Sequence, residues 1–175
     1  MKQVNKIKDI LNNPKSIIIF LTIMLAISVF VIYRVSNSSK IYISSIKDEN
    51  ISISTIHAFI NNDMNMFYST PATYNKDDYK IYGIEVGYYI KENDNYKEFL
   101  TQSDTFDTGE SLKTALEFYS SYNYIESNNR IKKFTKRVKN NFEDNLYFII
   151  KVKKDKNTSL ETIYEENVYM KKMTK

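Results

Sequence analysis

The chain has 175 residues, of which 42% are hydrophobic and 14% aromatic, and it carries a formal net charge of +4. About 135 residues remain after the first 40 are set aside, which is enough for one ordinary domain with a hydrophobic core. The absence of cysteine excludes disulfides, thiolate metal sites, a thiol nucleophile and a lipid-modified N-terminal cysteine.

An uncharged apolar run extends from Ser16 to Tyr33 and is bracketed by Lys15 and Arg34. Eighteen helical residues would span roughly 27 Å, close to the hydrocarbon thickness of a bilayer. The sequence therefore predicts a transmembrane helix over residues 16–34. A cleaved signal peptide is the alternative, but its apolar region is usually shorter and ends at a small-residue cleavage site.

The segment before this run is basic, with Lys2, Lys6, Lys8 and Lys15 against one acidic residue. The positive-inside rule then predicts that residues 1–15 are cytoplasmic and that the C-terminal domain is extracytoplasmic, on a cell membrane. The lipid bilayer would be the first partner. Small residues at positions 22 and 26 would let two such helices approach, which allows a homo-oligomer.

Residues 35–45 are interpreted as a polar tether and residues 46–175 as one exposed domain. Within this domain, Ile53, Ile56 and Ile60 recur at spacings of three and four, which predicts an amphipathic helix over 46–67. The alternation of apolar and other residues over 79–91 predicts a strand, followed by a turn at 92–95.

A second extended segment is expected over 96–106, and a helix is expected to begin near Glu110 with Asp107 or Thr108 as its cap. Leu112 and Leu116 would lie on its buried face. Another helix is predicted over 127–139.

Residues 146–153 and 162–170 read as a closing β-hairpin. The predicted fold class is therefore α+β: one N-terminal transmembrane helix, then a small domain whose helices pack on an antiparallel sheet that ends in a C-terminal hairpin.

The densest charged feature is the segment 130–139, in which six of ten residues are basic. On a helix, Arg130, Lys133, Lys136 and Arg137 would form a face that binds an anion or a partner. A lipid headgroup or an anionic wall polymer would suit it. A solvated face that complements the acidic part of the domain is the simpler explanation, and the expected outside location argues against nucleic acid.

Catalytic motifs are absent from the sequence. His57 is the only histidine, no nucleophile-elbow or phosphate-loop pattern occurs, and three glycines are too few for a phosphate cradle. We expect no metal, no cofactor and no enzymatic activity. Asp104, Asp107 and Glu110 could form a carboxylate site in principle, but helix capping explains them more simply.

The leading functional prediction is a non-enzymatic scaffold protein that binds other membrane or envelope proteins in a bacterial assembly of the secretion or conjugation type. This prediction is an architectural analogy and rests on no family motif. The first alternative is a module that binds a ligand or a wall polymer, with Tyr82, Tyr88 and Tyr89 lining a pocket. A membrane-tethered hydrolase that uses the acidic cluster is the second.

Overall fold

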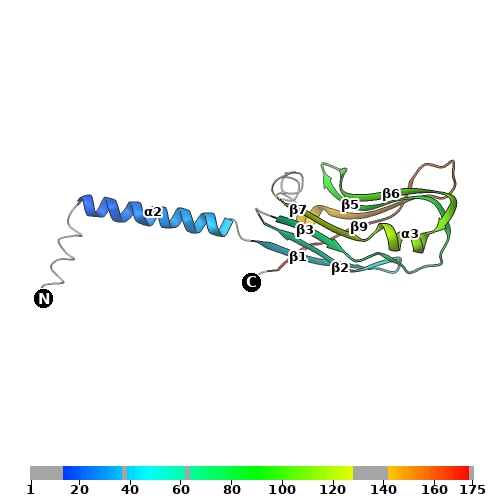
Figure 1. Ribbon diagram of the computed structural model, residues 1–175, viewed down its shortest axis with the longest axis horizontal. Helices are drawn as coiled ribbons and strands as arrows, with labels where there is room; N and C mark the ends of the chain where they lie inside the picture. The colour runs from blue at the N-terminus through cyan, green and yellow to red at the C-terminus, as the bar shows by residue number, and fades with distance from the viewer. Residues whose placement is uncertain (1–13, 37–38, 62–63, 128–141, 174–175) are drawn as a thin grey trace. The chain divides into compact units, whose positions relative to one another are not determined.

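The computed structural model of the protein describes residues 14–36, 39–61, 64–127 and 142–173 (Figure 1). The chain divides into two units, residues 1–38 and residues 39–175. The first unit contains helix α2, Pro14–Ser36. The second contains the strands β1 Lys40–Lys47, β2 Ile51–Ile60, β3 Met64–Ser69, β4 Thr73–Tyr74, β5 Lys80–Glu92, β6 Asn95–Ser111, β7 Tyr122–Ser127, β8 Leu146–Lys153, β9 Glu161–Asn167 and β10 Lys171–Lys172, with helices α3 Leu112–Tyr119 and α5 Phe142–Asn145.

Helix α2 corrects the predicted transmembrane helix. Across the described ranges, no helix combines the length and the apolar character that a membrane span requires. The prediction of a span over 16–34, and the cell-membrane localisation derived from it, are therefore wrong.

The second unit is a pair of antiparallel sheets rather than an α+β domain. Sheet A has the order β10-β1-β2-β3-β7, with β4 also paired to β2, and sheet B has the order β6-β5-β8-β9. Every pairing among the described strands is antiparallel. The strands β1, β2 and β3 form one layer and β5, β6 and β9 the other (Figure 1).

One hydrophobic core fills the space between the sheets. Ile53, Ile56 and Phe67 of sheet A belong to the same buried cluster as Tyr88 and Phe148 of sheet B. The ring of Tyr88 lies 4.7 Å from that of Phe67 and 5.1 Å from that of Phe148, between centroids. The Tyr88 hydroxyl shares a 2.7 Å hydrogen bond with the Ser69 hydroxyl, so its polar atom is satisfied inside the core.

The predicted helix over 46–67 is wrong, because this segment forms β2, the end of β1 and most of β3. In β2 the buried residues are 51 and 53, and then 56, 58 and 60. Ser54 and Thr55 both lie outside the core, so the alternation shifts by one residue between them. Two strand patterns offset by this extra residue produce the spacings of three and four that resemble a helix.

Several other predicted elements are present. The strand over 79–91 is β5, and the extended segment over 96–106 lies inside β6. The hairpin over 146–153 and 162–170 corresponds to β8 and β9, which pair antiparallel. β1 begins at Lys40, inside the segment interpreted as a tether. The helix predicted over 127–139 lies almost entirely outside the described residues.

Helix α3 is one of the few helical elements that the second unit shows. Its buried residues include Leu112 and Leu116, as predicted. Its cap is Ser111, whose hydroxyl accepts a hydrogen bond from the Thr114 backbone N–H at 3.1 Å. The caps expected at Asp107 and Thr108 belong to β6 instead.

Candidate functional site

The outer face of sheet A, which points away from the core, is the candidate functional surface. Strand alternation places Met66 and Tyr68 of β3 on this face, whereas Phe67 between them is fully buried. The same alternation places Phe59 and His57 of β2 outward. The face is therefore built from every second residue of β1, β2, β3 and β7.

An apolar row crosses this face at right angles to the strands. Ile41 pairs with Phe59, Phe59 with Met66, and Met66 with Ile125. Directly opposed residues on one face have Cβ atoms about 5 Å apart, so the four side chains form a continuous strip. Ile41 is 40% exposed and Ile125 is 56% exposed, which leaves the strip open to solvent at both ends. We call these four residues the apolar row.

A second row lies beside it, two residues along each strand. Ile43 pairs with His57, His57 with Tyr68, and Tyr68 with Asn123. The His57 and Tyr68 rings are 6.4 Å apart and tilted, and Tyr68 is 43% exposed. The two rows together contain no lysine, arginine, aspartate or glutamate. Large exposed apolar groups without charged residues among them are uncommon on a protein surface. Where they occur, they are typical of the centre of a binding interface.

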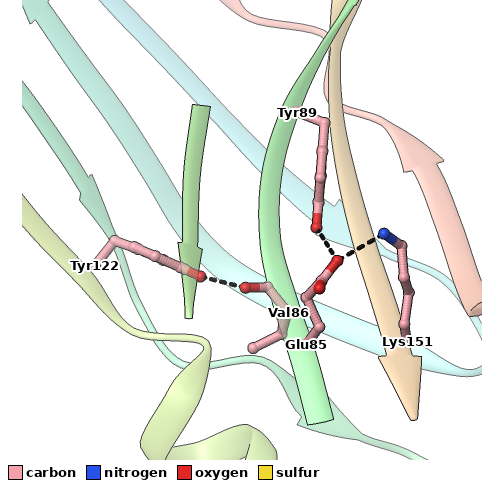
Figure 2. A network of polar contacts seen from close by, with 5 residues as sticks. All are labelled: Glu85, Val86, Tyr89, Tyr122 and Lys151. Atoms are coloured by element: carbon pink, nitrogen blue, oxygen red, sulfur yellow. Dashed lines mark hydrogen bonds and ion pairs between the residues drawn. The ribbon is translucent and has the colours of Figure 1, made fainter. Parts of the chain in front are cut away.

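The outer face of sheet B has the opposite character. Glu85 and Lys151 are directly paired on β5 and β8, and the Lys151 ammonium lies 2.6 Å from the carboxylate. The Tyr89 hydroxyl donates a 2.7 Å hydrogen bond to the same carboxylate oxygen, as Figure 2 shows. The Lys151 ammonium also lies 5.1 Å from the Tyr89 ring centre, a cation–π contact.

The ionisation of this network follows from its surroundings. Burial opposes ionisation of Glu85, but the hydrogen bonds from Lys151 and Tyr89 and the Lys151 charge outweigh it, so the pKa of Glu85 is lowered. The pKa of Tyr89 is raised by burial and by its hydrogen bond to Glu85. Glu85 is therefore ionised at neutral pH, and its Oε1 accepts from two donors, which suits a structural role.

The two sheets are also tied by a polar contact within the core. The Tyr122 hydroxyl of β7 donates a 2.6 Å hydrogen bond to the backbone carbonyl of Val86 on β5 (Figure 2). Burial raises the pKa of Tyr122, so this hydroxyl stays protonated and continues to donate. The contact holds β7, the strand that also carries Ile125 of the apolar row, against β5 of sheet B.

The basic residues proposed as an anion- or partner-binding face, Arg130, Lys133, Lys136 and Arg137, lie outside the described residues. The prediction for this face stays a prediction.

The other candidates identified from the sequence are dispersed. His57 is exposed on β2 rather than on a helix. Tyr88 lies inside the core, whereas Tyr89 points to the opposite face of β5, so these two do not line a common pocket. Asp104 accepts a hydrogen bond from Tyr119, and Glu110 accepts one from the Ser111 backbone at 2.8 Å.

The two rows were missed because register cannot be read from one strand. The local signal was present in β3, where Met64, Met66 and Tyr68 alternate with buried residues. Because this segment was predicted to be helical, its strand-like alternation of exposed and buried residues was not recognised. Only the pairing of four strands shows that these outward residues line up with Phe59 and Ile125.

The fold therefore defines a two-sheet antiparallel β domain whose sheet A carries two adjacent outward rows without lysine, arginine, aspartate or glutamate. Within the described ranges, no group of three or more histidine, cysteine, aspartate or glutamate residues is placed to hold a metal ion. No protein-family model, no curated protein and no solved structure matches the chain.

Proposed function

We propose that this chain is a non-enzymatic interaction protein that binds another protein through the outer face of sheet A. The observation that carries the proposal is the pair of cross-strand rows, which present Ile41, Phe59, Met66, Ile125 and Tyr68 without a carboxylate, lysine or arginine among them. Protein interfaces are enriched in aromatic residues and methionine and are depleted of charge at their centre.

The chemistry of the face also defines the partner. A charged group placed over the two rows would lose its hydration without gaining an ion pair from them, which is unfavourable. The partner is therefore a protein surface with apolar side chains at its centre. The charged network on the outer face of sheet B would remain in water when sheet A is covered.

A photo-crosslinking experiment in the producing cells tests this function. The full-length chain carries a photoreactive phenylalanine analogue in place of Ile125 in one variant and in place of Thr105 in another. Thr105 is an exposed residue of β6 in sheet B, so it provides the matched control. We expect a discrete crosslinked product from position 125 and none from position 105. The mass of the product distinguishes a second copy of the chain from a different protein.

A second substitution tests whether the crosslinked product depends on the apolar row. With the probe at position 125, Met66→Glu should reduce the crosslinked yield by about tenfold, because a carboxylate at the centre of the interface has no partner. Thr105→Glu should leave the yield unchanged. Equal yields from both positions, or a yield that Met66→Glu does not reduce, would contradict the proposal.

A further inference from the structure

A groove rich in hydroxyl groups runs across sheet A beside the second row, whose Ile43 and His57 line one end of it. It comprises three adjoining hollows of about 520, 280 and 440 Å³. Ser54 lines all three, Ser45 lines the first two, and Pro71 and Thr73 line the last two. The shared residues make the hollows one continuous depression, which we call the Ser54 groove.

The groove lies where the hydrogen-bond ladders of sheet A are interrupted. On one side, the register of β1 against β2 shifts between Ser44 and Ile46. On the other side, β2 changes partner from β3 to β4, which leaves residues 53–55, including Ser54 and Thr55, between the two pairings. Bulges and partner changes bend a sheet locally and redirect side chains, and they often occur beside binding sites.

The hydroxyls of the groove floor are held in place. The Thr70 side chain accepts a hydrogen bond from the Thr55 backbone N–H at 3.1 Å and lies 3.0 Å from the Ser54 hydroxyl. The Ser44 hydroxyl donates to the Tyr169 carbonyl at 2.7 Å, which fixes the backbone that carries the Tyr169 ring. A hydroxyl can donate and accept, so a fixed row of them complements a ligand with many hydroxyls.

Aromatic rings and lysines stand along the groove. Tyr169, which is 68% exposed, lines the first hollow, and Tyr74 lines the third. Lys171, Lys47 and Lys113 each line one of the three hollows, whereas Glu117 is the one carboxylate among the lining residues. The groove therefore offers hydroxyls, rings at both ends and an excess of positive charge.

We propose that the Ser54 groove binds an extended acidic polysaccharide. Sugar hydroxyls match the serine and threonine hydroxyls, the apolar faces of sugar rings can cover the tyrosine rings, and carboxylates or other anionic groups match the lysines. The depression is shallow and open to solvent, whereas a small ligand is usually enclosed over most of its surface. A chain that crosses the sheet can make contacts in all three hollows at once.

This proposal does not depend on the protein-binding function. The groove shares Ile43 and His57 with the second row, but none of its lining residues belongs to the apolar row. A substitution in one surface should therefore weaken binding at that surface and leave binding at the other unchanged. Ile125→Glu should leave polysaccharide binding unchanged, and a groove variant should leave the protein crosslink at position 125 unchanged.

Titration calorimetry with the full-length protein tests the groove. The probes are polygalacturonate, the neutral polysaccharide dextran, and poly-L-glutamate, which has carboxylates but no sugar hydroxyls. We expect saturable binding of polygalacturonate and affinities lower by about tenfold or more for the other two. This comparison matters because any polyanion can associate with the basic segment 130–139 through charge alone. Equal binding of poly-L-glutamate, or no binding of polygalacturonate, would overturn the proposal.

Single substitutions in the Ser54 groove test whether polygalacturonate binds there. Ser54→Leu fills the point common to all three hollows and should lower the affinity for polygalacturonate by about tenfold or more. Ser103→Leu, at an exposed serine of β6, is the matched control and should have no effect. Tyr169→Ala and Lys171→Gln change exposed side chains and provide a second measurement if Ser54→Leu fails to fold. Unchanged affinity in the folded groove variants would overturn the proposal.

Discussion

Glu85 is a charged side chain of sheet B that two donors hold in place. Its carboxylate receives the Lys151 ammonium at 2.6 Å and the Tyr89 hydroxyl at 2.7 Å, and its side chain is only 20% exposed. By contrast, the Lys154–Glu161 pair at 3.0 Å has both side chains more than half exposed. Burial and a second donor distinguish the first pair, so its removal leaves a partly buried lysine without its anion.

Glu85→Gln should lower the free energy of unfolding by about 1–3 kcal/mol at pH 7. The pKa of Glu85 is below its ordinary value of 4.5 in the folded protein. Its contribution is therefore present above about pH 4.5 and is lost as the pH falls through the folded-state pKa. Urea denaturation at pH 7 and at steps below pH 4.5 should show the two proteins converging in acid.

The control for this measurement is Glu161→Gln. Exposed pairs contribute about 0–1 kcal/mol, so this change should have a small effect at every pH. A loss in Glu85→Gln that persists unchanged in acid would show that the ionised carboxylate is not the source of the stabilisation.

At the scale of the elements, uninterrupted alternation was readable from the sequence and interrupted alternation was not. From Ile84 to Ile90 of β5 and from Leu146 to Val152 of β8, every second residue belongs to the core, and both strands were predicted. β2 contains the extra residue at Ser54–Thr55, which changes the apparent period and led to the helix prediction. The predicted fold class was wrong because of this one irregularity.

The candidate surface was less predictable than the strands. The apolar row requires that Phe59, Met66 and Ile125 lie side by side, although Ile125 is far away in the sequence. Pairing of β3 with β7 brings them together across β4, β5, β6 and α3. Hydrophobic pattern determines which face a residue takes, but long-range register determines its neighbours.

The turn between β5 and β6 was predicted, and its backbone geometry gives a second prediction. Asn93 and Asp94 both have positive φ, 49° and 63°, as in a type I′ hairpin turn. Glycine adopts this conformation without the steric cost that Asp94 incurs. Asp94→Gly should therefore raise the free energy of unfolding by about 0.5–1 kcal/mol.

The measurement is the urea concentration at the midpoint of unfolding, which should rise while the slope of the unfolding free energy against urea concentration stays unchanged. The Asp94 carboxylate is 99% exposed and 3.9 Å from Lys91, so its loss should remove little favourable interaction. Asp94→Ala is the control, because it removes the same carboxylate without relieving the positive φ. A midpoint for Asp94→Gly no higher than that for Asp94→Ala would contradict the backbone argument.

At the scale of the β domain, the two sheets share one core and should unfold as one unit. Tyr88 of sheet B contacts Phe67 of sheet A, Tyr122 of sheet A and Phe148 of its own sheet. Neither sheet can separate without exposing this aromatic cluster to water. The two outward rows of sheet A are thus supported by the same core that supports the charged network of sheet B.

Phe67→Ala tests this coupling. Phe67 is fully buried, and its truncation should lower the free energy of unfolding by about 3–5 kcal/mol. If the sheets unfold together, amide hydrogen exchange should accelerate in β8 of sheet B by the same factor as in β2 of sheet A. Ile125→Ala, an exposed residue paired on the same sheet, should change neither rate appreciably. Faster exchange confined to sheet A would mean that the sheets open independently, so that the outer face of sheet A could deform without disturbing sheet B.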